Sequence, residues 1–128
     1  MTQRPLLSNK LSSFKNTYHF AMRLNESTRV LQKYPDRIPI ICEKHTNCDI
    51  AEMSKQKYLV SDDLTCGQFI YIIRNRLKLP PEKAIFLMIN GTIPPISSTI
   101  LEVYDKNKNE DGFLYITYMS ENVFGLGG

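Results

Sequence analysis

The chain has 128 residues, of which 42% are hydrophobic and 23% charged, and its formal net charge is +3. This length and composition are typical of one globular domain that buries its own core. A membrane span is excluded on length, because the longest apolar run, Ala84–Ile89, is far shorter than the roughly 20 residues that a span needs. Three cysteines without paired spacing favour reduced thiols in the cytosol, and without an apolar signal core near the N-terminus we expect no secretion.

The positive charge is concentrated in the N-terminal part of the chain. Residues 1–37 hold seven lysines and arginines against two acidic residues, a net charge of +5, whereas residues 38–128 carry a net charge of −2. A basic arm on a mildly acidic body favours an acidic partner surface. The arm lacks the combined aromatic and basic density of nucleic-acid-binding proteins, so we expect no nucleic-acid partner.

The first third of the chain predicts helix and then strand. Residues 1–10 show no hydrophobic period, and we expect a flexible leader. Residues 11–33 contain neither proline nor glycine and predict an amphipathic helix, either continuous or broken near Thr17-Tyr18. Pro35 ends it, and residues 37–44 predict a strand. Because Pro39 has no amide hydrogen, this strand must have a free edge near its start.

The remaining elements alternate between strand and helix. Residues 57–60 predict a second strand, and Thr65 with Gln68 forms a capping box at the start of a helix that Pro80 stops. Residues 84–89 predict a buried strand, 98–104 a short helix and 113–118 a last strand. A hairpin, a crossing helix and two more strands form the α+β arrangement called the ubiquitin-like β-grasp.

Candidate chemical sites are weak. Cys42, His45 and Cys48 have a spacing compatible with soft metal ligands, but no fourth cysteine or histidine lies nearby in the sequence. No sequence signature orients a cysteine nucleophile towards His45 or His19, and the isolated glycines form no phosphate-binding loop. We therefore expect a protein that is not an enzyme and that carries no cofactor or metal.

The C-terminal residues 123–128, Val-Phe-Gly-Leu-Gly-Gly, have a composition unsuited to core packing. We expect a flexible tail after a domain at 11–122, with residues 1–10 as the leader. A glycine-rich tail can thread a narrow groove and present an unhindered carboxylate, which suits a substrate for acyl transfer. An incidental frayed terminus is the alternative.

Several long motifs resemble the ubiquitin-like autophagy modifiers, GABARAP and its relatives. The motifs are residues 34–44 (YPDRIPIICEK), 57–60 (KYLV), 64–69 (LTCGQF), 79–86 (LPPEKAIF), 111–118 (DGFLYITY) and 121–125 (ENVFG). They occur in the family's order from about Phe14 to Gly125. The resemblance implies a β-grasp domain with two additional N-terminal helices.

The resemblance also implies a life cycle for the C-terminus. A family cysteine protease cuts after Gly125, next to Phe124, and ubiquitin-like activating and conjugating enzymes then join this glycine to phosphatidylethanolamine. The protein is then expected in the cytoplasm, as a monomer in solution, and on autophagosomal or other vesicle membranes once it carries the lipid. Two acyl chains, at about 0.8 kcal/mol per buried methylene, are enough for stable anchoring.

The second implied function is the docking of cargo receptors that carry aromatic-x-x-aliphatic peptides along the free edge of the second strand. The aromatic pocket would consist of Glu26, Val30, Pro39, Ile41, Lys57, Leu59 and Phe113. The aliphatic pocket would consist of Tyr58, Val60, Leu64, Phe69 and Ile72. The basic rim, which would meet acidic residues around the peptide, is Arg37, Lys55 and Arg76, together with Lys57.

The chain departs from the family pattern in three places. Ser61 replaces the usual proline, residues 18–23 lack the usual basic pattern, and Leu126-Gly127-Gly128 follows the processing glycine and is similar to the ubiquitin ending. Two other classes stay open at this point: a non-conjugated β-grasp interaction scaffold in vesicle trafficking, and a small metalloprotein built on Cys42, His45 and Cys48.

Overall fold

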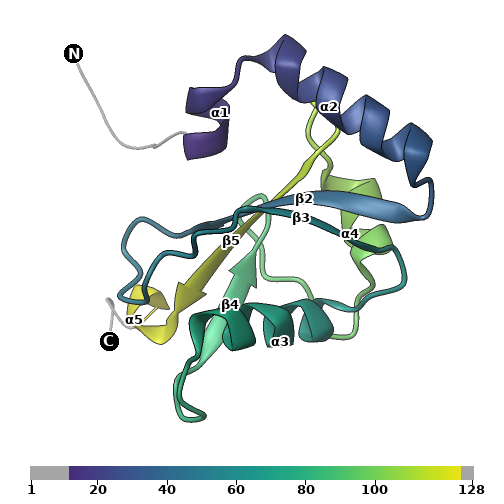
Figure 1. The fold of residues 1–128 in the computed structure, drawn as a ribbon. Helices are drawn as coiled ribbons and strands as arrows, with labels where there is room; N and C mark the ends of the chain where they lie inside the picture. The colour runs from purple at the N-terminus through teal and green to yellow at the C-terminus, as the bar shows by residue number, and fades with distance from the viewer. Residues whose placement is uncertain (1–11, 125–128) are drawn as a thin grey trace.

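The computed structural model describes residues 12–124, which form a four-stranded sheet with helices on both sides (Figure 1). The expected leader, residues 1–10, and the tail from Gly125 onwards lie outside the described residues. The elements in chain order are α1 (Ser13–Thr17), α2 (Phe20–Lys33), β2 (Arg37–Lys44), β3 (Lys57–Ser61), α3 (Cys66–Leu77), β4 (Ile85–Met88), α4 (Ile100–Asn107), β5 (Leu114–Ser120) and α5 (Glu121–Phe124).

The strand order is β3-β2-β5-β4, so β3 and β4 are the outer strands. The central strands β2 and β5 pair in parallel, whereas β3 with β2 and β4 with β5 pair antiparallel. A parallel central pair flanked by antiparallel neighbours, with α3 crossing between β3 and β4, is the predicted β-grasp topology. Of the two alternatives for the N-terminal helix, the structure has the broken one, because α1 ends at Thr17 and α2 begins at Phe20.

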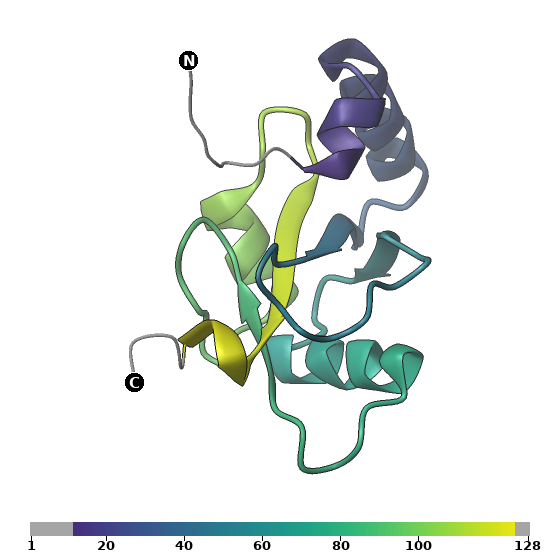
Figure 2. The same ribbon diagram turned by 90° about the vertical axis from the view of Figure 1, so that its left-hand side faces the viewer.

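Both faces of the sheet are covered. Figure 1 shows α1 and α2 on one side and α3 on the other, and Figure 2 shows the strands between them after a quarter turn. Alternate residues of β2 serve the two faces: Ile38 and Ile40 belong to the main core with α3, and Ile41 packs with Phe14 of α1 and Phe113. This double coverage explains why β2 is apolar at successive positions instead of alternating.

The ends of the helices follow their capping residues. The predicted box at the start of α3 is confirmed, since the Thr65 hydroxyl accepts from the Gln68 amide and the Gln68 side chain accepts from the Thr65 amide. The short helix expected at 98–104 begins instead at Ile100 and ends at Asn107. The reason is a second capping box, between Thr99 and Glu102.

Candidate functional site: the β3 edge

Among the described residues 12–124, the outer strand β3 pairs only with β2, and its other edge has no neighbouring strand. On its inner side, the Cys42 amide donates to the Gln56 carbonyl at 2.8 Å, and the Asp62 amide donates to the Asp36 carbonyl at 3.1 Å. These two hydrogen bonds lie just before and just after the paired residues of β2 and β3. They show which residue pairs between the strands exchange hydrogen bonds, because every second pair of an antiparallel ladder does so. The intervening β3 residues direct their amide and carbonyl groups away from β2. These outward-facing residues are Lys57, Leu59 and Ser61. The Ser61 carbonyl already accepts from the Leu64 amide at 3.2 Å.

The same alternation explains why Pro39 is tolerated in a central strand. Pro39 lies opposite Leu59, in a pair that exchanges no hydrogen bonds, so its nitrogen faces the β5 side. The register with β5 starts only at Ile40. The expected free edge near the start of the strand is therefore confirmed.

The residues predicted for the aromatic pocket gather on the α2 side of the sheet. Lys57 and Leu59 lie opposite Ile41 and Pro39 in the register, so all four side chains share one face. Ile41 and Phe113 are buried beneath Phe14, whose ring meets the Phe113 ring edge-on at 5.3 Å. These two residues can therefore supply only the floor of a pocket.

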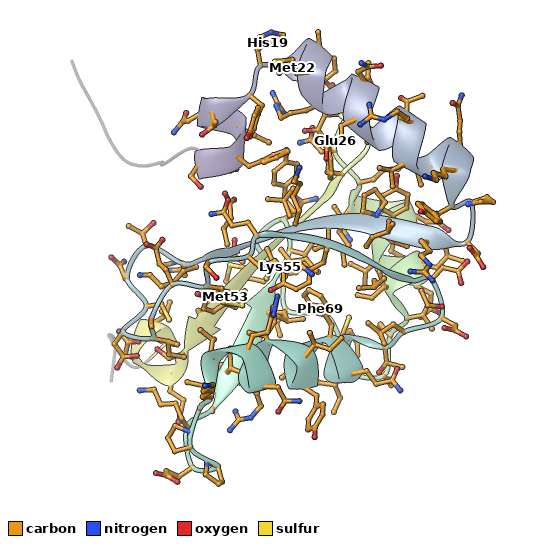
Figure 3. The ribbon with its side chains drawn as sticks, in the orientation of Figure 1. His19, Met22, Glu26, Met53, Lys55 and Phe69 are labelled. Atoms are coloured by element: carbon orange, nitrogen blue, oxygen red, sulfur yellow. The ribbon has the colours of Figure 1, made fainter. Side chains whose placement is uncertain are left out.

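Two further residues predicted for the aromatic pocket, Glu26 and Val30, belong to helix α2. Glu26 and Val30 are half-buried, and Figure 3 shows Glu26 on the sheet-facing side of the helix. The Lys57 ammonium lies 2.8 Å from a Glu26 carboxylate oxygen and thus bridges β3 and α2. Because the Lys57 side chain is 52% exposed, this ion pair is screened by water and contributes about 1 kcal/mol or less. An incoming ligand can separate it at little cost.

The residues predicted for the aliphatic pocket gather on the opposite, α3 side. Tyr58 and Phe69 are buried with their rings edge-on at 5.5 Å, and Figure 3 shows Phe69 between α3 and the sheet. Val60, Leu64 and Ile72 pack against the main core but stay partly accessible. In the predicted pocket, the buried pair would form the floor and the other three the walls.

The basic rim lies along the same edge. The Arg76 guanidinium donates to the Tyr58 hydroxyl at 3.2 Å, and the Lys55 ammonium lies 4.9 Å from the Tyr58 ring centre. Burial raises the pKa of the Tyr58 phenol, although Arg76 opposes the shift, so this hydroxyl stays neutral. Arg37 lies opposite Ser61 at the far end of β3. Cations therefore flank both ends of the strand.

Two anchoring networks hold the N-terminal helices over the site, and the sequence predicts neither. One Glu43 carboxylate oxygen accepts from the hydroxyls of Ser12 and Ser13 and from the Phe14 amide, at 2.9–3.1 Å. The partners lie 29–31 positions apart in the chain, and no local pattern could have revealed them. The network holds Phe14 against Ile41 and Phe113.

The second network holds α2. The Arg23 guanidinium lies 2.5 Å from a carboxylate oxygen of Asp111, which is fully buried and also accepts from the Tyr115 hydroxyl. The Ser27 hydroxyl donates to the Asp111 carbonyl. The sequence indicates only a turn role for Asp111, and its side chain does accept from the Phe113 amide as well. The turn before β5 therefore positions Glu26 and Val30.

The three metal-ligand candidates, Cys42, His45 and Cys48, have separate surroundings. Cys42 is buried in the core, and burial raises the pKa of its thiol, which disfavours the thiolate that metals and electrophiles need. The Cys48 sulfur faces the Ser120 hydroxyl, and the His45 ring nitrogen Nδ1 accepts from the Asn47 amide. Within residues 12–124, no three histidine, cysteine or acidic side chains are grouped to hold a metal ion.

The predicted conjugation residue, Gly125, lies outside the described residues, and α5 ends at Phe124 just before it. In the part of the chain that the structure describes, no helix has the length and hydrophobicity to cross a membrane.

Comparisons with known proteins agree with this architecture. The family model for the autophagy protein Atg8, described as ubiquitin-like, matches residues 22–125. Autophagy-related protein 8 of Candida glabrata is 55% identical over 114 residues, which cover 89% of this chain and 97% of the relative. Autophagy-related protein 8 of Schizosaccharomyces pombe is also 55% identical and is covered to 94%.

A solved structure gives the same result in three dimensions. The crystal structure of Trypanosoma brucei ATG8 superposes with a TM-score of 0.84 at 44% identity, over 88% of this chain and 97% of that one. The resemblance and the ubiquitin-like fold expected from the sequence are both confirmed. This chain belongs to the Atg8 family of ubiquitin-like autophagy proteins.

Proposed function

We propose that this chain is a ubiquitin-like autophagy modifier whose β3 edge docks cargo receptors through aromatic-x-x-aliphatic peptides. One observation carries the proposal: the two groups of candidate pocket residues lie on opposite faces of the sheet, on either side of a free strand edge. Side chains of an extended strand alternate between faces, so two residues three positions apart point to opposite faces. A peptide that adds to β3 therefore directs one anchor to each pocket.

The order of the pockets along β3 gives the peptide a direction. The first residue of the strand, Lys57, belongs to the aromatic pocket. The aliphatic pocket includes Val60, the last residue but one of the strand, and Leu64, which lies beyond its end. Since the aromatic anchor precedes the aliphatic one, the peptide runs parallel to β3. The outward groups of Lys57 and Leu59 then supply main-chain hydrogen bonds, and the pockets supply specificity.

The spacing of the anchors is the sharpest test. Three otherwise identical peptides would carry one, two or three residues between a tryptophan and a leucine, and their Kd values would be measured by calorimetry. For the peptide with two intervening residues we expect a Kd at least about ten-fold lower than for the other two peptides. One or three intervening residues would put both anchors on the same face of the peptide strand. Equal affinities for all three would contradict the proposal.

Amide NMR signals locate the bound peptide. We expect shifts at Lys57 and Leu59 in β3, and none along β4, the other outer strand of the sheet. Shifts concentrated in β4 would place the peptide elsewhere and refute docking at β3.

We further propose that the chain is itself a substrate and not a catalyst. A family cysteine protease would cut after Gly125, and activating and conjugating enzymes would join this glycine to phosphatidylethanolamine. The family match supports this assignment because it ends at Gly125 and excludes the last three residues. The protein would reside in the cytoplasm as a monomer and on autophagosomal membranes after lipidation.

A further inference from the structure

An open apolar hollow of about 550 Å³ lies between the first half of α3 and the loop before α4. Its large apolar lining residues are Leu64, Tyr71, Ile72 and Ile96. Tyr71 is 65% exposed and Ile96 is 68% exposed, the two highest values among the large hydrophobic side chains of residues 12–124. Neither side chain contributes much to the core, and clustered exposed apolar side chains commonly mark a binding surface.

Backbone hydrogen bonds hold the two sides of the hollow together. The Gly67 amide donates to the Ile96 carbonyl at 2.9 Å, and the Cys66 amide donates to the Ser98 carbonyl at 2.8 Å. A Cβ atom at position 67 would lie 3.3 Å from the Ile96 carbonyl oxygen, so glycine permits this close approach. The first turn of α3 therefore holds the loop, and Ile96 stays beside the helix. Such pre-organisation lowers the entropy cost of binding.

The hollow lies next to the proposed docking site at β3. The inference that follows rests on that proposed docking. Leu64 and Ile72 line the hollow and belong to the aliphatic pocket as well. A peptide parallel to β3 passes Ser61, whose amide faces outward, and then reaches Leu64. In an extended peptide the residue two positions after the aliphatic anchor faces α3 again.

We propose that this hollow is a third subsite, which binds an apolar side chain two positions after the aliphatic anchor of the receptor peptide. The subsite would favour receptors of the pattern aromatic-x-x-aliphatic-x-apolar over those that carry a polar residue at the last position.

Three synthetic peptides test the subsite by calorimetry with the full chain. They share an aromatic-x-x-leucine segment and continue with Ser-Ser, Ser-Leu or Leu-Ser. We expect the Ser-Leu peptide to bind about ten-fold more tightly than the Ser-Ser peptide, and the Leu-Ser peptide to show little gain because its leucine faces away from α3. Equal Kd values for all three would overturn the inference and leave peptide docking intact. No binding by any of them would instead reject the docking proposal itself.

Protein variants give an independent readout. In the variants Ile96→Ser and Tyr71→Ser, the Ser-Leu peptide should lose part of its advantage in affinity over the Ser-Ser peptide. The Kd of the Ser-Ser peptide should stay unchanged. Ile93→Ser is the matched control, because Ile93 is 47% exposed in the same loop but does not line this hollow. A gain that survives in both variants, or that Ile93→Ser abolishes equally, would refute the assignment.

Discussion

Two ion pairs near the site differ in burial and therefore in their contribution to stability. Asp111 is fully buried and Arg23 is 11% exposed in one pair, whereas Lys57 is 52% exposed in the other. Removing one member of a buried pair leaves an uncompensated charge in the core, whereas water readily replaces a lost surface partner.

Arg23→Met should accordingly lower the free energy of unfolding by about 3 kcal/mol. Lys57→Met, the control for a surface pair, should lower it by less than about 1 kcal/mol. Denaturant titration at neutral pH measures both. Similar losses in the two variants would show that the α2 anchor is not the stabilising contact described above.

The buried phenol of Tyr118 should make the free energy of unfolding depend on pH in the alkaline range. Its buried hydroxyl donates to the Ala51 carbonyl at 2.8 Å and accepts from the Met53 amide, and burial raises its pKa to about 12. A raised pKa in the folded state favours the neutral phenol. Its stabilising contribution is therefore complete below the unfolded pKa of about 10 and is lost as the pH rises towards 12.

Tyr118→Phe has no hydroxyl to ionise. The difference in unfolding free energy between wild type and this variant should therefore shrink between about pH 9 and pH 12, by at most about 2.7 kcal/mol. Lysine titration affects both proteins and cancels in the difference. A difference that stays constant over this range would be inconsistent with a raised Tyr118 pKa.

At the scale of elements, the placement of α2 depends on one glycine. Gly112 has φ +88°, and a Cβ atom there would meet the Ser27 hydroxyl of α2 at a distance too short for any contact. Gly112→Ala must therefore both strain the turn and displace the helix that carries Glu26 and Val30. Gly91 offers a control, since it has φ +81° but a Cβ atom added there would meet no heavy atom within 4 Å.

Gly112→Ala should lower the free energy of unfolding by about 3 kcal/mol. It should also raise the Kd of the peptide that has two residues between its anchors several-fold. Gly91→Ala should cost about 1 kcal/mol, from backbone strain alone, and leave the peptide Kd unchanged. Denaturation and calorimetry on the same samples separate the two effects. If both variants bind the peptide as wild type does, α2 does not form a wall of the site.

The sequence predicts elements where the signal is local. The Thr65 capping box locates α3, and the apolar residues of 37–44 locate β2. The capping box of Thr99 is local as well, and it places the start of α4 two residues later than the hydrophobic pattern alone suggests. By contrast, the Arg23–Asp111 contact spans 88 positions, and only the packing of α2 on the sheet creates it. Long-range polar contacts of this kind leave no periodicity in a sequence.

At the scale of the whole molecule, the sheet separates two sets of residues that the sequence interleaves. Tyr58 and Val60 face α3, whereas Lys57 and Leu59 face α2, so neighbours in the chain serve opposite faces. Family resemblance names the members of the two predicted pockets. Under the proposed docking, the strand alternation would require two residues between the anchors of a receptor peptide. The pocket assignments stay a prediction until the peptide titrations are made.

The proposed conjugation of this chain to a membrane lipid through Gly125 can be measured directly. The direct measurement is the intact mass of the product after incubation with the family protease, the activating and conjugating enzymes and liposomes that contain phosphatidylethanolamine. An Atg8 relative, run in parallel, shows that the enzymes are active. We predict a chain that has lost residues 126–128 and gained one phosphatidylethanolamine, and no product from Gly125→Ala. A full-length chain conjugated through Gly128, or an unmodified chain beside a conjugated relative, would rule out conjugation through Gly125.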